Sequence, residues 1–192
     1  MTTTSFDHLT DAVASAYDFS AFSTLVALGG DRGALLVAIL AAYPGLRGVL
    51  FDHPHVIASA GGTVEASGVA DRCEVVGGDL FKALPSGGLA YLLNGVIRDW
   101  DDEHALAILT NCRRAMGQRG TLLLVELVLP ADDAFASSGL TALASVRSPG
   151  GHERTEADHR ALLAATGFTL ARVISTGTGF DVIEGVPVKG TH

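Results

Sequence analysis

Glycines and acidic residues recur in the first half of the chain in an order that suits a nucleoside-type ligand. Gly29 and Gly33 bracket a short loop. Asp52 follows the next apolar run, and Asp79 follows the one after it, behind a Gly-Gly pair. Glycines let a ligand approach the backbone closely, and carboxylates accept hydrogen bonds from ribose hydroxyls. Each residue alone is compatible with an ordinary turn, but the ordered set favours nucleoside binding.

These residues stand at the ends of short apolar runs, which alternate with helix-like segments. The alternation predicts an α/β fold with a doubly wound, mostly parallel, Rossmann-like sheet and a C-terminal antiparallel hairpin. Ligands of such sheets bind at the carboxyl ends of the strands, where the candidate residues lie. The predicted strands cover residues 23–28, 48–51, 74–76, 89–93, 121–127, 168–175 and 180–186. The predicted helices cover residues 34–43, 56–67, 102–116 and 155–166.

The composition indicates a globular protein with one main domain. The chain has 192 residues, of which 48% are hydrophobic and 18% charged, enough to form a sizeable core. We expect a lead-in helix over residues 1–20 and a single domain over residues 21–192. The formal net charge of −8 argues against nucleic acid or an anionic membrane as partner. Because no apolar run could span a bilayer and no export signal is visible, a cytoplasmic location is expected.

Cysteine and histidine spacing gives no metal-binding pattern. Cys73 and Cys112 lie far apart in apolar contexts, so we expect buried free thiols. His53 and His55 follow Asp52, but such a pair is more often a loop or a helix cap than a metal site. No metal is expected.

Five motifs carry a resemblance to a known family. They are LVALGG at 25–30, VLFDHPHV at 49–56, RCEVVGGDLF at 72–81, DWDDE at 99–103 and GGHERT at 150–155. Their order and separation resemble the plant-type and actinobacterial SAM-dependent O-methyltransferases, which act on phenolic and polyketide hydroxyls. The similarity runs from about residue 17 to residue 187 and implies a SAM-methyltransferase sheet. It also implies that the family's N-terminal dimerisation domain is absent, since the chain begins after it.

The resemblance implies S-adenosylmethionine as cofactor and suggests which residues contact each part of it. Gly29 and Gly33 would approach the methionine part, and Asp52 would bind the ribose. Asp79 and Leu80 would flank the adenine. Asn94 stands where the family usually has a lysine near the cofactor, and Trp100 would pack near the cofactor.

The cofactor region departs from the family pattern at two positions. Ala27 replaces an acidic residue near the end of the first strand, and Asp31 replaces the middle glycine of the loop. Asp31 would place a carboxylate beside that of the cofactor, which opposes binding by on the order of 1 kcal/mol. Alternatively, Asp31 turns outward and binds the cofactor's amino group in place of the acid lost at position 27.

Arg98 stands where the family has its catalytic histidine, which deprotonates the substrate hydroxyl. An arginine cannot accept a proton at neutral pH. The two glutamates that orient the histidine correspond to Glu126 and Glu153. We expect Arg98 to be paired with a carboxylate, which would give both glutamates a structural role. The alternatives are that Arg98 binds an anionic group of a ligand, and that His152 substitutes as the base.

Three functions are compatible with this pattern, and all involve a small molecule or a protein partner. The first is an O-methyltransferase acting on a small aromatic or polyketide hydroxyl, impaired by Arg98 and relying on positioning and an already ionised phenol. The second is a non-catalytic binding or partner protein, since apolar surface left by the absent domain would favour a homodimer or another partner. The third is a repurposed biosynthetic enzyme that performs non-methyl chemistry. We place the first ahead.

Residues 141–149 are small or polar where the family has apolar pocket walls.

Overall fold

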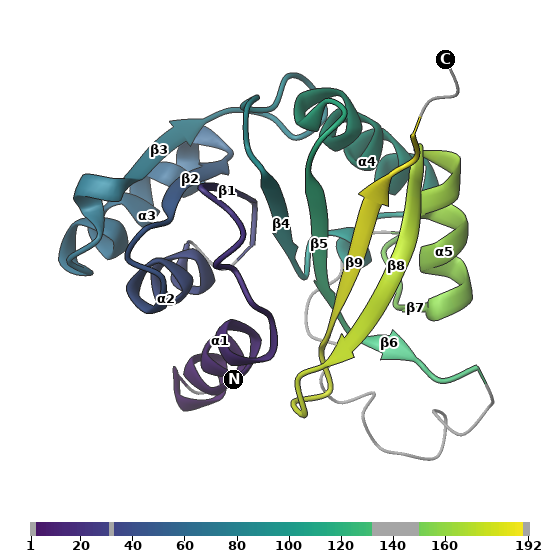
Figure 1. The fold of residues 1–192 in the computed structure, drawn as a ribbon, viewed down its shortest axis with the longest axis horizontal. Coiled ribbons are helices and arrows are strands. Elements are labelled where there is room, and N and C mark those ends of the chain that lie inside the picture. Colours follow the sequence, from purple (N-terminus) through teal and green to yellow (C-terminus); the bar gives the residue numbers. More distant parts are fainter. Residues whose placement is uncertain (1–2, 31–32, 132–149, 190–192) are drawn as a thin grey trace.

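The computed structural model describes residues 3–30, 33–131 and 150–189 of the chain. A seven-stranded sheet has the order β3-β2-β1-β4-β5-β9-β8 (Figure 1). Its parallel part consists of β1 (Thr24–Leu28), β2 (Arg47–Asp52), β3 (Cys73–Gly77), β4 (Ala90–Asn94) and β5 (Thr121–Glu126). The hairpin of β8 (Phe168–Ser175) and β9 (Asp181–Pro187) joins it antiparallel to β5. The predicted doubly wound sheet with a C-terminal hairpin is therefore confirmed.

The helices also lie close to their predicted ranges. They are α1 (Thr3–Ala16), α2 (Ala34–Ala42), α3 (Pro54–Ala66), α4 (Asp102–Met116) and α5 (Glu156–Ala165). Helix α3 begins two residues before the predicted start, because Pro54 at the first helical turn has the φ angle that a helix needs. The sequence patterns did not reveal the 3-10 turns η1 (Ala70–Arg72) and η2 (Ile97–Asp99), nor the short parallel pair of β6 (Val128–Leu129) and β7 (Arg154–Thr155).

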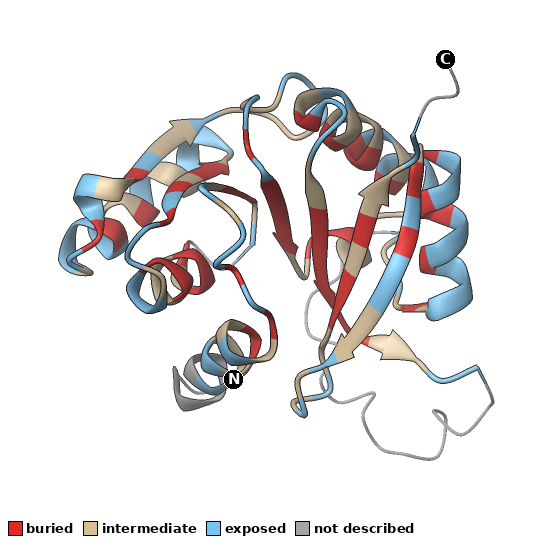
Figure 2. Cartoon of the chain, in the orientation of Figure 1, coloured by how far each residue is buried: buried red, intermediate tan, exposed pale blue. Residues whose placement is uncertain are grey.

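The core lies on both faces of the sheet. Leu25 and Ala27 of β1 pack with α1, α2 and α3, while Val26 and Leu28 pack with α4 and α5. This alternation follows from the two-residue period of a strand. The middle strands are accordingly buried along most of their length (Figure 2). A sheet covered on both faces leaves only its edges open to a ligand.

The residues before β1 are tied to the C-terminal hairpin. The Tyr17 hydroxyl donates to Glu184 Oε2 at 2.8 Å, and Arg172 forms an ion pair with the same carboxylate at 2.9 Å. Burial, followed by the Glu184 interaction, raises the pKa of Tyr17 to about 12. Tyr17 therefore stays protonated at neutral pH and can keep donating this hydrogen bond.

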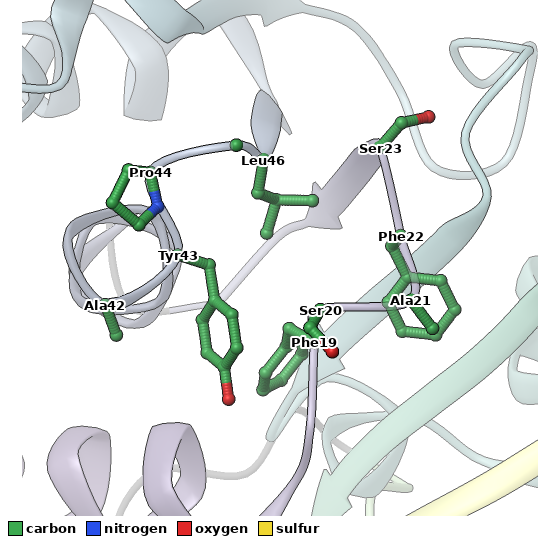
Figure 3. A pocket seen from close by; sticks show the side chains of 10 residues that line it. Phe19, Ser20, Ala21, Phe22, Ser23, Ala42, Tyr43, Pro44 and Leu46 are labelled. Atoms are coloured by element: carbon green, nitrogen blue, oxygen red, sulfur yellow. The ribbon is translucent and has the colours of Figure 1, made fainter.

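A cavity of about 440 Å³ lies at the opposite edge from the candidate residues (Figure 3). Its walls come from residues 19–23 and 42–46, which lead into the amino ends of β1 and β2.

Cys73 and Cys112 are free and buried, as predicted. None of the helices in the described ranges is both long enough and apolar enough to cross a membrane.

Candidate functional site

The loop after β1 has a backbone that only glycines adopt without strain. Gly29, Gly30 and Gly33 have φ angles of 64°, 99° and 88°. A Cβ atom on Gly30 would lie 3.0 Å from the Asn94 carbonyl oxygen, and one on Gly33 would lie 2.8 Å from the Leu50 side chain. The loop thus passes close over the end of β4. Asp31, the other residue of interest in this loop, lies outside the described residues.

Backbone hydrogen bonds join the carboxyl ends of neighbouring strands. The Gly29 N–H donates to the Phe51 carbonyl at 2.8 Å, and the Gly78 N–H donates to the Asp52 carbonyl at 2.9 Å. The first three strand ends are therefore held side by side. The Gly95 N–H continues the same edge by donating to the Val125 carbonyl at 2.9 Å. This edge places the glycine loop beside Asp52, as expected for residues at parallel strand ends.

Asp52 is a half-buried carboxylate at the end of β2. Its Oδ1 accepts a hydrogen bond from the His53 N–H at 2.6 Å. Burial raises the pKa of Asp52, and the His53 hydrogen bond opposes that rise. His53 Nδ1 lies 2.8 Å from His55 Nδ1, so the two rings interact with each other. The described residues contain no group of three or more potential metal ligands.

An aromatic wall adjoins the loop that contains Asp79 and Leu80. The Leu80 side chain would lie 3.6 Å from a Cβ on Gly29, so this loop borders the glycine loop. Asp79 Oδ1 accepts from the Phe81 N–H at 2.9 Å, which holds the pKa of Asp79 below its usual value. The Phe81 ring meets Trp100 edge-on, with centroids 4.9 Å apart. Leu80 and Trp100, far apart in sequence, are thus brought to one side of the edge.

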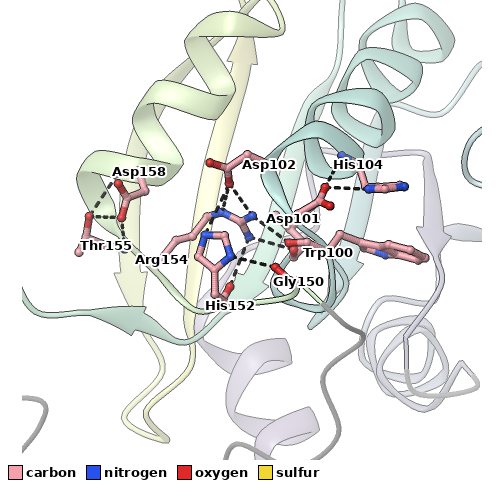
Figure 4. Close-up of polar contacts among 10 residues, drawn as sticks. Trp100, Asp101, Asp102, His104, Gly150, His152, Arg154, Thr155 and Asp158 are labelled. Atoms are coloured by element: carbon pink, nitrogen blue, oxygen red, sulfur yellow. Dashed lines mark hydrogen bonds and ion pairs between the residues drawn. The ribbon is translucent and has the colours of Figure 1, made fainter.

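Trp100 also stacks on His104 of α4, with ring centroids 5.4 Å apart and an interplanar angle of 26°. The Asp101 carboxylate caps α4 by accepting from the His104 N–H at 2.9 Å, and it contacts His104 Nδ1 at 2.7 Å (Figure 4). The cap fixes the His104 ring, which in turn supports Trp100. The position of Trp100 is therefore set by the start of α4.

The expected ion pair of Arg98 with Glu126 or Glu153 is wrong. Within the described part of the chain, Arg98 is at ion-pair distance from neither glutamate. Its guanidinium instead lies over the Phe180 ring, 5.6 Å from the centroid. The reason is the turn η2, which presents a backbone donor to Glu126: the Ile97 N–H donates to Glu126 Oε1 at 2.9 Å.

Glu126 is a buried acid at the end of β5, with 1% of its surface exposed. Its Oε2 atom has no hydrogen-bond partner among the described residues. Burial raises the pKa of Glu126 to about 8, against the opposing effects of the Ile97 N–H and the Arg98 charge. At neutral pH this carboxyl is therefore mostly protonated. The carboxyl ends of β4 and β5 therefore lead to a permanent cation, Arg98, and to an acid that is mostly neutral, Glu126.

Arg154 is a buried residue that the sequence analysis did not single out (Figure 4). Its Nε and Nη2 atoms donate to Asp102 Oδ1 at 3.0 and 2.7 Å. The remaining donors reach the carbonyls of Ile97 at 3.0 Å, Trp100 at 2.9 Å and His152 at 3.4 Å. All five N–H groups of a guanidinium can be used in this arrangement.

This Arg154 cluster connects three segments of the candidate site. It joins η2, which carries Arg98, to the start of α4 and to the segment that carries Glu153. The sequence signal was present in the GGHERT motif, but an arginine in an expected loop ordinarily lies on the surface. Only the fold shows that the loop closes over it.

His152, the alternative base, contacts Gly150 and Asp102. Its Nδ1 atom lies 3.3 Å from the Gly150 carbonyl oxygen, and its Nε2 atom lies 3.6 Å from Asp102 Oδ1. Asp102 is thus a residue that could orient this imidazole, which the sequence did not reveal. The role of His152 as a base stays a prediction.

Comparisons with known proteins agree on one family. The family model described as an O-methyltransferase domain matches residues 3–169. Phenazine O-methyltransferase PhzM of Lysobacter antibioticus is 46% identical over 178 residues, which are 92% of this chain and 52% of that protein. O-demethylpuromycin-O-methyltransferase of Streptomyces alboniger is 42% identical over 179 residues, which are 90% of this chain and 47% of that protein.

Solved structures show the same relationship. The crystal structure of LaPhzM has a TM-score of 0.85 and 43% identity, covering 95% of this chain and 55% of that one. The structure of the mitomycin 7-O-methyltransferase MmcR has a TM-score of 0.87 and 35% identity, covering 96% of this chain and 54% of that one. The chain therefore spans about half the length of the proteins it matches.

Proposed function

This chain belongs to the O-methyltransferase family, and from this premise we propose that it binds S-adenosylmethionine and methylates a hydroxyl of a small aromatic or polyketide molecule. Support comes from the carboxyl ends of the parallel strands, where the glycine loop, Asp52 and the Asp79–Leu80 loop lie along the same edge as η2 and Glu126. Two similar proteins point the same way. CalO1 was solved with SAH bound, and NcsB1 was solved with SAM and 2-hydroxy-5-methyl naphthoic acid.

Among the residues that the structure describes, those of this edge fit the cofactor with one exception. We infer that Gly29 and Gly33 give the methionine part its close backbone approach, and that the half-buried Asp52 accepts hydrogen bonds from the ribose. The exception is Ala27, which is 6% exposed and offers no carboxylate to the cofactor's amino group. When bound, the cofactor supplies a methyl group on a positively charged sulfur.

The other members of the proposed cofactor site line the adenine side and the end of β4. Asp79 and Leu80 would flank the adenine, Trp100 would support that wall through Phe81, and Asn94 would lie near the cofactor below the glycine loop. Arg98, Glu126 and Glu153 would border the acceptor hydroxyl. Because Glu126 is protonated at neutral pH and Arg98 cannot accept a proton, neither is a strong base there.

Calorimetric titration with S-adenosylhomocysteine tests the cofactor assignment. We expect binding by the wild type, and a 10- to 100-fold weaker Kd in Asp52→Ala, since hydrogen bonds to a charged acceptor are lost. Asp71→Ala, which removes an exposed carboxylate on η1, is the matched control and should bind normally. No heat from the wild type at millimolar ligand would contradict the proposal.

A specific observation favours a second candidate, a non-catalytic binding protein. Ala27 and Arg98 together remove an acidic cofactor contact and the family's base. Incubation with S-adenosylmethionine and a panel of hydroxyarenes, followed by mass spectrometry, separates the two. Methylated product supports the enzyme, whereas cofactor binding without any product supports the binding protein. Association as a homodimer or with another protein stays a prediction that a solution mass measurement can check.

A further inference from the structure

We propose that the acceptor is an acidic hydroxyl, aromatic or enolic, that is already ionised at neutral pH, and that Arg98 binds its oxyanion. This inference rests on the proposed methyl transfer and names the class of molecule that the site accepts. Hydroxyquinones and related vinylogous acids belong to this class. Ordinary phenols, which keep their proton at pH 7, do not.

The first support is the state of the Arg98 guanidinium. It is half-buried in η2, the turn that follows β4, and lies over the Phe180 ring at 5.6 Å from the centroid. A cation–π contact of this kind uses none of the N–H donors of the guanidinium in a hydrogen bond to an oxygen. Within the part of the chain that the structure describes, the N–H edge of the guanidinium donates no hydrogen bond and forms no ion pair. Oxyanions are the ligands that such an edge binds best.

The second support is that no carboxyl group of the described residues forms an ion pair with Arg98, and that the buried Glu126 resists ionisation. Burial holds the pKa of Glu126 near 8, so this group is largely neutral at pH 7. Burial also raises the pKa of Asp99 within the same turn, against the Arg98 charge, and raises that of Asp181, which follows Phe180. Glu153, a further carboxylate of the site, is not at ion-pair distance from Arg98. The Arg98 guanidinium therefore has no ion-pair partner within 4.0 Å among the residues that the structure describes.

The chemistry balances without a base. An oxyanion attacks the methyl carbon, the new C–O bond forms as the C–S bond breaks, and the sulfonium becomes a neutral thioether. One negative and one positive charge disappear, and no proton has to be removed in the site. A phenol with a pKa of about 10 is ionised to roughly one part in a thousand at pH 7, so Arg98 would favour acidic acceptors strongly.

A matched pair of naphthalene acceptors tests the inference. At pH 7, 2-hydroxy-1,4-naphthoquinone is ionised and 2-naphthol is not, so we expect kcat/KM to be at least tenfold higher for the quinone. Arg98→Gln should lose at least tenfold on the quinone and keep its affinity for S-adenosylhomocysteine. Arg98→Lys should recover part of the loss. Arg119→Gln, at an exposed position, is the control and should behave as the wild type.

The pH profile distinguishes this mechanism from proton removal by Glu126. If only the oxyanion reacts, turnover of 2-naphthol should rise about tenfold per pH unit from 7 to 9. A plateau near pH 8 that disappears in Glu126→Gln would identify Glu126 as a base and overturn the inference. Equal turnover of both acceptors at pH 7, or an unchanged preference in Arg98→Gln, would also overturn it.

A binding measurement keeps the inference testable if turnover is absent. In the presence of S-adenosylhomocysteine, the ionised quinone should bind at least tenfold more tightly than 2-naphthol, and Arg98→Gln should abolish the difference. Methylation of both acceptors at equal rates would refute the acceptor class and leave the proposed methyl transfer intact. Failure to bind S-adenosylhomocysteine would refute the proposed function itself, while preferential binding of the quinone would still support the oxyanion site.

Discussion

At the scale of single residues, the proposed role of Arg98 depends on its inability to accept a proton at neutral pH. Arg98→His would restore a group that can accept a proton. Glu126 interacts electrostatically with position 98, and its Oε2 atom, which has no partner among the described residues, would be the acceptor available to the new imidazole. We expect this variant to methylate 2-naphthol at pH 7 roughly 100-fold faster than the wild type, the lower range for general base catalysis. Product formation by mass spectrometry measures the gain. Equal rates would mean that Glu126 does not orient the new side chain.

Glu126 should leave a signature in the pH dependence of stability. Its pKa is about 8 in the folded chain, above its ordinary value of 4.5, so the folded state binds more protons between these pH values. Its contribution therefore destabilises the fold progressively as pH rises from 4.5 to 8, by on the order of a few kcal/mol. Urea unfolding at pH 5 and pH 8 should show this loss. Glu126→Gln should remove it, and exposed Glu65→Gln should not.

At the scale of elements, the Arg154 cluster holds η2, α4 and β7 in one arrangement. Arg154→Lys keeps the charge but has fewer donors than the five used here, so the carbonyls of Ile97 in η2 and of Trp100 after it compete for them. We expect a loss of about 3 kcal/mol in unfolding free energy, in the range for a broken buried pair. Arg160→Lys, in an exposed pair with Glu156, should cost less than about 1 kcal/mol.

A kinetic readout separates a positioning role of Arg154 from stability alone. Below the unfolding temperature, Arg154→Lys should lower kcat for the quinone at least tenfold while the Kd for S-adenosylhomocysteine stays within about threefold. The cluster holds η2 directly and reaches the proposed cofactor site only through the Trp100 carbonyl. Proportional changes in both constants would argue that the substitution only loosens the whole fold.

The elements themselves were largely predictable, because periodic apolar runs and capping residues are local signals. The capping box of Thr155 and Asp158 at the start of α5 is an example of such a local signal. The surroundings of Arg98 were not predictable, because they depend on how η2 turns its backbone toward Glu126. The burial of Arg154 depends likewise on three segments distant in sequence. The candidate site could therefore be placed at the strand edge from sequence, but its pairings could not.

At the scale of the whole molecule, two polar contacts connect segments that are far apart in the sequence. Tyr17 and Glu184 connect the segment after α1 to the hairpin, and Arg154 connects β7 to α4. His159 of α5 is 2% exposed and interacts electrostatically with Arg154. Its Nδ1 atom has no hydrogen-bond partner among the described residues. A buried neutral imidazole next to Arg154 makes the stability of the entire fold sensitive to acid.

Burial, reinforced by the Arg154 charge, lowers the pKa of His159 to about 4, below its ordinary value of 6.5. The unfolded chain therefore binds more protons between these values, so stability is present above pH 6.5 and is lost as pH falls toward 4. From pH 7 to pH 5 this residue should cost about 2 kcal/mol. Urea unfolding should show a shallower acid slope in His159→Gln and His159→Phe than in the wild type, whereas exposed His8→Gln should keep the wild-type slope. An unchanged slope in both His159 variants would show that this imidazole gains its proton in the folded protein as readily as in the unfolded chain.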